Sequence, residues 1–173
     1  MNATTENIVL IGMPGAGKST LGVVLAKMLG MDFVDCDLVI QRQHGKTLQE
    51  IIDDEGAGGF IAAEEQALAG LDAECSIIAT GGSAVYSDVA MQHLATMGPI
   101  VYLEISYESL VTRLGDLHER GVVLRNGTSI SLRELYDERE PLYRSYANLT
   151  VNVDDQTIPV AARKVADAIS DRA

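Results

Sequence analysis

The sequence is poor in basic residues and in cysteine, and it has no long apolar run. Lys and Arg together number 13 against 25 Asp and Glu, which gives the 173-residue chain a formal net charge of −12. Because such a surface repels nucleic acid and anionic lipid at long range, we predict no nucleic-acid partner and no membrane binding. No apolar run approaches the roughly 18 residues of a membrane span. An anionic ligand therefore needs a locally positive pocket.

The two cysteines, Cys36 and Cys75, are too few for a disulfide framework. We interpret them as reduced thiols and expect a cytoplasmic protein. Residues 1–7 lack the basic and apolar regions of a secretory signal peptide, which agrees with this expectation. With 47% hydrophobic residues and ordinary contents of Gly and Pro, the chain has the composition of a single globular domain.

Short apolar runs alternate with longer stretches of helical periodicity. Strands are predicted from the apolar runs at residues 7–12, 32–35, 76–79, 100–105 and 149–153. Helices are predicted at residues 19–29, 37–44, 47–55, 60–71, 88–97, 106–114, 131–146 and from 157 onward. We predict an α/β fold in which five parallel strands form one sheet flanked by helices on both faces. Ligands of such sheets bind at the carboxyl ends of the strands.

Glycine and proline supply the remaining local signals. The helix predicted to end at residue 55 is followed by three helix-breaking glycines, Gly56, Gly58 and Gly59. Pro141 predicts a kink in the helix at residues 131–146. Thr157 is predicted to cap the last helix, with Pro159 near its first turn.

Residues 12–19, with the sequence GMPGAGKS, match the phosphate-binding pattern G-x-x-x-x-G-K-[ST] between a predicted strand and a predicted helix. The glycines let backbone N–H groups turn toward phosphate oxygens, Lys18 supplies a charge, and Ser19 offers a hydroxyl to Mg²⁺. The pattern predicts a bound nucleoside triphosphate and leaves the reaction open. The predicted nucleotide-binding residues here are Gly12, Pro14, Gly15, Ala16, Gly17, Lys18, Ser19 and Thr20.

Two carboxylates, Asp35 and Asp37, follow the second predicted strand. One could reach the shell of a Mg²⁺ ion through water, and the other could accept a proton from an attacking hydroxyl. The alternative interpretation is that Asp37 only caps the following helix. Beside a phosphate-binding loop, the functional interpretation is favoured.

The third predicted strand is followed by a glycine turn, Thr80-Gly81-Gly82-Ser83, whose adjacent glycines allow a ligand to approach the backbone closely. Phosphoryl transfer needs cations near the transferring phosphate. Residues 115–130 lack a helical period, and we predict that they form a mobile lid that closes over the site. The candidate cations in and around this segment are Arg113, Arg120, Arg125 and Arg139.

Six stretches spread over nearly the whole chain carry a family resemblance: NIVLIGMPGAGKST, FVDCD, DDEGAGGF, IIATGG, IVYLEI and EREPLY. In this order and spacing they resemble the shikimate kinases, small P-loop enzymes of the nucleoside-monophosphate-kinase-like group. The resemblance implies one kinase domain over residues 1–173, with substrate-binding helices at about 37–71 and a lid at about 115–130. It implies transfer of the γ-phosphate of ATP, with Mg²⁺, to a ring hydroxyl of shikimate in aromatic amino-acid biosynthesis. We expect the protein to act as a monomer.

The resemblance also implies roles for individual residues. Lys18 resembles the phosphate-binding lysine, Asp37 the candidate base, and Arg120 the lid arginine that reaches the transferring phosphate. Ser19 and, through water, Asp35 resemble the residues that hold Mg²⁺. The substrate-binding positions are Asp37, Ile61, Gly81, Gly82, Ser83 and Arg139, of which Arg139 grips the substrate carboxylate. Nucleotide contacts outside the phosphate loop are Arg113, which stacks on adenine, and Pro159.

Departures from the family pattern leave the substrate open. Ile61 stands where the family has a second carboxylate-binding arginine, Ser83 replaces a third glycine, and the lid reads Arg-Gly-Val-Val instead of Arg-Pro-Leu-Leu. Losing a charge-assisted hydrogen bond costs on the order of 1.5–3 kcal/mol. We favour a shikimate kinase with a weakened clamp, helped by another arginine such as Arg42 or Arg144. A kinase for another small polyhydroxylated, uncharged substrate comes next, and an inactive nucleotide-binding relative comes last.

Overall fold

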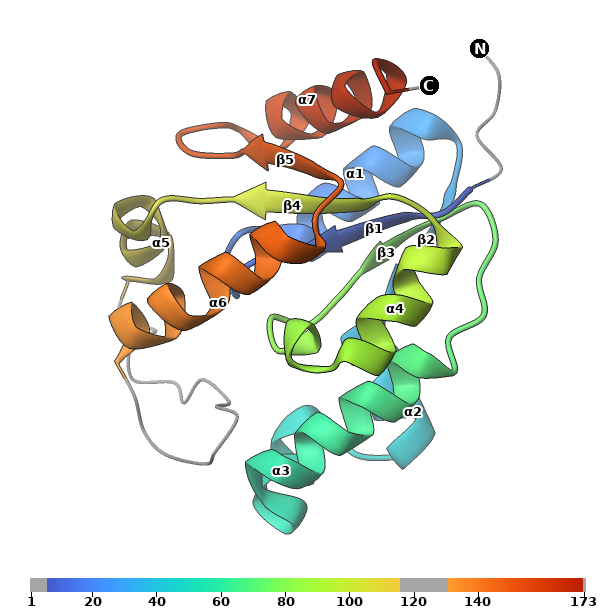
Figure 1. Ribbon diagram of the computed structural model, residues 1–173, viewed down its shortest axis with the longest axis vertical. Coiled ribbons are helices and arrows are strands. Elements are labelled where there is room, and N and C mark those ends of the chain that lie inside the picture. The colour runs from blue at the N-terminus through green and yellow to red at the C-terminus, as the bar shows by residue number, and fades with distance from the viewer. Residues whose placement is uncertain (1–5, 116–130, 173) are drawn as a thin grey trace.

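The computed structural model describes residues 6–115 and 131–172, and their arrangement is drawn in Figure 1. One sheet of five parallel strands has the order β2-β3-β1-β4-β5. The predicted α/β architecture is therefore confirmed. The strands are β1 (Ile8–Ile11), β2 (Asp32–Asp35), β3 (Ser76–Ala79), β4 (Ile100–Glu104) and β5 (Leu149–Asn152).

The central position of β1 follows from its composition. All four of its residues are apolar and at most 1% exposed, because β1 is paired on both edges and covered on both faces. Val9 is in register with Ile78 on one side and with Ile100 on the other. The edge strands β2 and β5 carry more polar residues, as strands with one free edge commonly do.

The helices form two layers around the sheet and one projecting lobe. Helices α1 and α7 pack together on one face, and α4 and α6 lie on the other (Figure 1). Helices α2 and α3 pack on each other in a lobe with its own small core of Ile40, Ile51, Phe60, Ala63 and Ala67. The helices are α1 (Lys18–Leu29), α2 (Cys36–His44), α3 (Leu48–Ala69), α4 (Asp88–Met97), α5 (Tyr107–Leu114), α6 (Leu132–Tyr146) and α7 (Ile158–Ser170), with a 3₁₀ helix η1 (Ala84–Tyr86).

The predicted break after residue 55 is confirmed at Gly56, where α3 is kinked, and is wrong for Gly58 and Gly59. Helix α3 runs from Leu48 to Ala69, and only Gly56 leaves helical geometry, at φ 71° and ψ −178°. Gly58 and Gly59 lie inside the helix. Packing of the α3 apolar residues in the lobe core offsets the roughly 1 kcal/mol by which each glycine disfavours a helix.

Three further predictions concern the Thr157 cap, the kink at Pro141 and the lid at residues 115–130. Thr157 occupies the N-cap position of α7, but its side chain makes no capping hydrogen bond, so that prediction is only half right. Helix α6 continues through Pro141. The predicted lid, with Arg120 and Arg125, lies outside the described residues apart from Gly115. Within the described ranges, no helix is long and apolar enough to cross a membrane.

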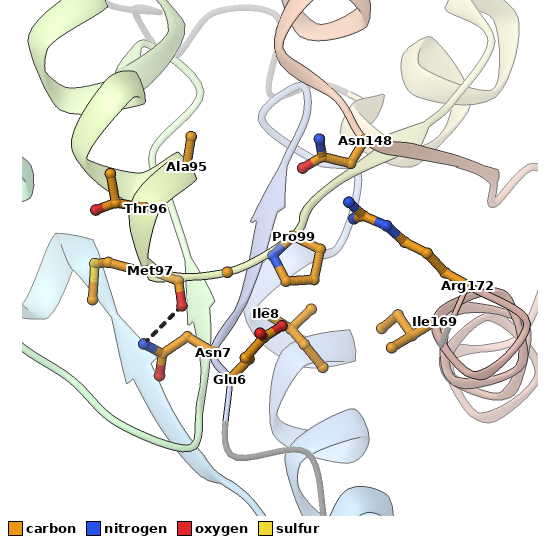
Figure 2. A pocket seen from close by; sticks show the side chains of 11 residues that line it. Glu6, Asn7, Ile8, Ala95, Thr96, Met97, Pro99, Asn148, Ile169 and Arg172 are labelled. Carbon is orange, nitrogen blue, oxygen red and sulfur yellow. Dashed lines mark hydrogen bonds between the residues drawn. The ribbon is translucent and has the colours of Figure 1, made fainter.

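A hollow of about 400 Å³ lies where β1 and β4 begin, opposite the strand ends that carry the predicted motifs (Figure 2). There the Asn7 side-chain amide donates to the carbonyls of Ala73 at 2.7 Å and Met97 at 3.4 Å, and its oxygen accepts from Ser76 N at 3.0 Å. Asn7 thus ties the start of β1 to β3 and to the end of α4. Gly98 fits against the same residue, because a β-carbon there would lie 1.8 Å from the Asn7 carbonyl oxygen.

We predict that Gly98→Ala lowers the free energy of unfolding by about 2 kcal/mol or more, because the clash is with backbone that cannot turn away. Gly58→Ala is the matched control, since a β-carbon at that helical position meets open space. It should be neutral or stabilise by about 0.5–1 kcal/mol. Urea unfolding of the two variants checks the difference, and equal stabilities would contradict it.

Candidate active site

The cavity that holds the predicted motifs has a volume of about 580 Å³ and lies at the carboxyl ends of β1, β2 and β3. Six groups of residues line it, from the phosphate-binding loop with the start of α1, from α2, α3, the glycine turn, α5 and α6. The predicted site residues that line it are Pro14, Gly15, Gly17, Lys18, Ser19, Thr20, Asp37, Gly81, Gly82, Ser83 and Arg139. Those that do not line this cavity in the described structure are Gly12, Ala16, Asp35, Ile61, Arg113 and Pro159.

Glycine is required where the phosphate-binding loop leaves β1. Gly12 has φ 147°, and a β-carbon there would lie 2.8 Å from the Leu103 carbonyl oxygen of β4. The loop can therefore turn only if this position has no side chain. Gly17 adopts a left-handed conformation, φ 92°, at the N-cap of α1, and the first turn of α1 contains no acidic residue. The positive end of α1 is thus free of a competing carboxylate from its own first turn.

Lys18 is held inside this loop. Its Nζ donates to the carbonyl oxygens of Gly12 at 2.7 Å and Met13 at 2.9 Å, and the residue is only 8% exposed. Burial lowers the pKa of Lys18 to about 8, against the opposing effect of the nearby Asp37 carboxylate. The lysine is thus a desolvated cation that a phosphate would hold more strongly than would a neutral carbonyl.

Arg113 connects the phosphate-binding loop to the segment after β5. Its guanidinium donates to the carbonyl oxygens of Ala16 at 3.3 Å and Val153 at 2.5 Å. Apolar side chains also pack against the loop, because Gly15 lies against Leu114, which lines the cavity, and Gly17 lies against Ile158. Arg113 and the first turn of α7, which holds Pro159, therefore flank the loop outside the cavity.

The alternative interpretation, that Asp37 only caps the following helix, is wrong. Asp35, not Asp37, is the N-cap of α2, and its Oδ1 accepts a hydrogen bond from Asp37 N at 3.0 Å. The side chain of Asp37 is left to line the cavity. Burial and the neighbouring Asp35 raise the pKa of Asp37, while Lys18 lowers it. A carboxylate with a raised pKa is a stronger base than an exposed one.

The glycine turn is fixed from α6. Tyr143 donates from its hydroxyl to the Gly82 carbonyl at 2.7 Å, and a β-carbon at Gly82 would lie 3.0 Å from Arg139 Nη1. Arg139 is 1% exposed, and its Nε donates to the Tyr86 hydroxyl at 3.0 Å. This places a buried guanidinium against the backbone of the turn, suited to a carboxylate ligand.

Glu64 is a site residue that the sequence analysis missed. It lines the cavity from α3, is 1% exposed, and accepts a hydrogen bond from the Ser83 hydroxyl at 2.5 Å. Burial raises the pKa of Glu64 to about 7. One signal could have found it: Glu64 falls on the same helical stripe as the apolar residues Phe60 and Ala67, where a carboxylate is out of place. The other lining residues not predicted are Leu48, Phe60, Thr80, Leu114 and Leu132.

The arginine missing at position 61 is not replaced by the two predicted substitutes. Arg144 is paired with Glu104 and Glu140, and Arg42 lies at a separate surface hollow beside α2. Ile61 itself is half-buried on α3, one helical turn before Glu64. Within residues 6–115 and 131–172, the only basic side chains that line the cavity are Lys18 and Arg139.

A family model, curated relatives and solved structures match nearly the whole chain. Residues 14–170 match the family model described as shikimate kinase. The shikimate kinase of Vibrio parahaemolyticus is 38% identical over 171 residues, which cover 98% of this chain and 99% of the relative. That of Thiobacillus denitrificans is 38% identical over 154 residues, covering 88% and 84%. The structure of shikimate kinase from Acinetobacter baumannii in complex with shikimate matches with a TM-score of 0.86 at 33% identity, covering 98% and 96%.

We predict that the buried Glu64 makes the free energy of unfolding depend on pH. Its folded pKa of about 7 lies above the ordinary value of 4.5, so the stability present below pH 4.5 is lost as pH rises toward 7. Between pH 5 and pH 7.5 this loss is about 2 kcal/mol. Glu64→Gln keeps an acceptor for Ser83 but cannot ionise, so it should lack that part of the loss.

Urea unfolding at the two pH values measures the effect, with the exposed Glu108→Gln as a control that keeps the wild-type pH dependence. An unfolding free energy that falls equally in wild type and Glu64→Gln would show that Glu64 ionises as freely as an exposed carboxylate.

Proposed function

The chain belongs to the shikimate kinase family, and we propose that it transfers the γ-phosphate of ATP to a ring hydroxyl of shikimate. The observation that carries this proposal is the composition of one cavity. A phosphate-binding loop with Lys18, a half-buried acid at Asp37 and a buried guanidinium at Arg139 all line it. These are the groups needed to hold a triphosphate, to accept a hydroxyl proton and to bind a carboxylate.

At the nucleotide end, the phosphate oxygens of ATP would take the place of the carbonyls that Lys18 now contacts. Backbone N–H groups of the loop and the start of α1 would complete the phosphate cradle. We propose that Arg113 and Pro159 bind the adenosine part, because both lie beside the loop and outside the phosphate cavity. Arg120 is proposed as the cation that reaches the transferring phosphate, and it lies outside the described residues.

A Mg²⁺ ion would be bound mainly by phosphate and water. No group of three His, Cys, Asp or Glu in the described ranges could hold a metal ion alone, which fits an ion that keeps waters and binds substrate phosphates. Ser19 is exposed to the cavity and would provide a hydroxyl, and Asp35 would act through water. The ion would supply charge neutralisation on the phosphates.

At the acceptor end, Asp37 would take the proton of the attacking hydroxyl. Its environment favours this role, since burial and Asp35 raise its pKa toward that of a useful base. Arg139 would bind the substrate carboxylate, and the Gly81-Gly82-Ser83 turn would lie against the ring. The turn needs small residues, because a β-carbon at Gly81 would lie 2.2 Å from Glu64 Oε1.

A second candidate substrate is supported by one observation. Arg139 has no second arginine beside it among the cavity residues that the structure describes, since Ile61 is apolar and Arg144 is paired elsewhere. A neutral polyhydroxylated molecule would not need that second cation. Shikimate remains the main proposal because the chain matches shikimate kinases over nearly its full length.

We predict that Lys18→Ala and Asp37→Asn each lower kcat by at least about 100-fold, because electrostatic positioning and proton transfer carry this reaction. Lys18→Ala should also weaken ATP binding. Lys27→Ala and Asp72→Asn, both exposed, are the matched controls and should retain wild-type activity. A coupled assay of ADP release with shikimate measures the effect. Wild-type turnover in Asp37→Asn would remove Asp37 from the chemistry.

Ile61→Arg distinguishes the two candidate substrates by the direction of its effect. With shikimate, a second guanidinium should raise kcat/KM roughly tenfold or more, since a charge-assisted hydrogen bond is worth about 1.5–3 kcal/mol. With a neutral substrate, the new guanidinium should lower the native activity, because the substrate has no carboxylate to pair with it. The same ADP-release assay, run with shikimate and with uncharged cyclitols and sugars, shows whether kcat/KM rises or falls for each acceptor. A gain only with a neutral acceptor would reject shikimate.

A further inference from the structure

Two basic and two acidic side chains line the cavity among the described residues. Lys18 and Arg139 contribute positive charge, while Asp37 and Glu64 can contribute negative charge. Lys18 belongs to the phosphate-binding loop, which leaves Arg139 as the basic side chain beside the glycine turn among the described cavity residues. Residues 60–71 of the chain, around Glu64, contain no Lys or Arg. Glu64 therefore has no cation from its own stretch of helix.

The carboxyl group of Glu64 is fixed against the glycine turn. Its Oε2 accepts the Ser83 hydroxyl, whereas Oε1 is buried and has no hydrogen-bond partner within the described residues. Oε1 lies beside the α-carbon of Gly81, and Arg139 Nη1 lies beside that of Gly82. The acid and the guanidinium thus contact neighbouring residues of one turn. A ligand carboxylate held by Arg139 would therefore come close to Glu64.

Two protonation states of Glu64 have opposite effects on such a ligand. An ionised Glu64 would repel the ligand carboxylate in a poorly solvated cavity, where like charges interact strongly. A protonated Glu64 removes this repulsion and can donate a hydrogen bond to a carboxylate oxygen. The unpartnered Oε1 is the atom available to carry that proton, since Oε2 already accepts from Ser83.

We propose that Glu64 is a specificity-determining residue of this site: its carboxyl group, held by Ser83, must carry a proton for a carboxylate-bearing substrate to bind beside Arg139. The inference rests on the proposed function and adds a condition to it. Ser83 acts as a positioning residue, because its hydroxyl fixes which carboxyl oxygen stays free. In this chain a neutral acid thereby takes the place of a second cation in the clamp.

The groups around Glu64 give its carboxyl a pKa near neutral pH, so that its protonation changes between pH 6 and pH 8. Its pKa is raised to about 7, mainly by burial and also by the carboxylate of Asp37 on α2. The Ser83 hydrogen bond, Arg139 on α6 and Lys18 on α1 lower it. Cys36 on α2 and Tyr143 on α6 also lie within electrostatic range. A substrate carboxylate that pairs with Arg139 weakens one of the effects that favour ionised Glu64, so binding should be accompanied by proton uptake.

The test compares the KM for shikimate of wild type and Glu64→Gln between pH 6 and pH 8. In wild type the KM should rise about tenfold, because the protonated fraction of a group with a pKa near 7 falls by that factor. In Glu64→Gln, which is neutral at every pH, this rise should be absent. The Glu64 carboxylate is one of the charges that raise the pKa of Lys18, so in Glu64→Gln any change in KM for ATP or in kcat that Lys18 causes should move to lower pH. The KM for shikimate, measured at saturating ATP, is therefore the readout that reports on Glu64.

Ser83→Ala provides a second readout. Removing the hydroxyl removes a hydrogen bond that lowers the pKa of Glu64, so the pH at which KM begins to rise should move upward. A merely structural role for Ser83 would raise KM without moving this pH. A third measurement needs no variant: calorimetry of shikimate binding to wild type at pH 7.5, in two buffers of different ionisation enthalpy, should detect proton uptake.

The outcomes separate this inference from the function on which it rests. Shikimate turnover with a pH-independent KM, an identical rise in Glu64→Gln, or binding without proton uptake would each overturn the role of Glu64 alone. No shikimate turnover by wild type at any pH would overturn the proposed function and, with it, this inference.

Discussion

The pairing of β1 with β3 on one side and with β4 on the other is the constraint on which the site depends. It buries β1 completely and makes its carboxyl end the point where the phosphate-binding loop begins. Gly12 can leave the strand so close to the β4 backbone at Leu103 only because it has no side chain. Thr80, at the start of the glycine turn, donates from its backbone and its hydroxyl to the Leu10 carbonyl. The nucleotide side and the acceptor side of the cavity are thus both attached to the same central strand.

Charge is the second constraint. The chain carries a net charge of −12, yet the described cavity places two cations, Lys18 and Arg139, where the anionic parts of its substrates would bind. Each is largely buried, so its charge is screened less by water and salt than a surface charge would be. The acids Asp37 and Glu64 keep this pocket from being strongly positive. Selection among ligands then depends on where each charge or hydroxyl lies, and less on long-range attraction.

The sequence analysis succeeded where a local pattern determines local geometry. The apolar runs located the strands, and the phosphate-binding pattern located Lys18, because both depend on residues close together in the chain. It was less successful where contacts between distant segments decide the outcome. Gly58 and Gly59 stay helical because α3 packs on α2, which no local signal contains. Glu64 was missed because its importance comes from Ser83 and Arg139, which lie on other elements. The cap of α2 is a local feature, but two acids lie two positions apart in the sequence, and only the orientation of the Asp35 side chain shows which of them is the cap.

The central claim is that this cavity phosphorylates shikimate. The most direct measurement is phosphorus and proton NMR of the products after purified protein is incubated with ATP, Mg²⁺ and shikimate. The account predicts one new phosphate ester on a ring hydroxyl of shikimate, formed in equal amount to ADP. Release of inorganic phosphate without any ester of shikimate would contradict it, as would an ester formed only when a neutral polyhydroxylated acceptor replaces shikimate.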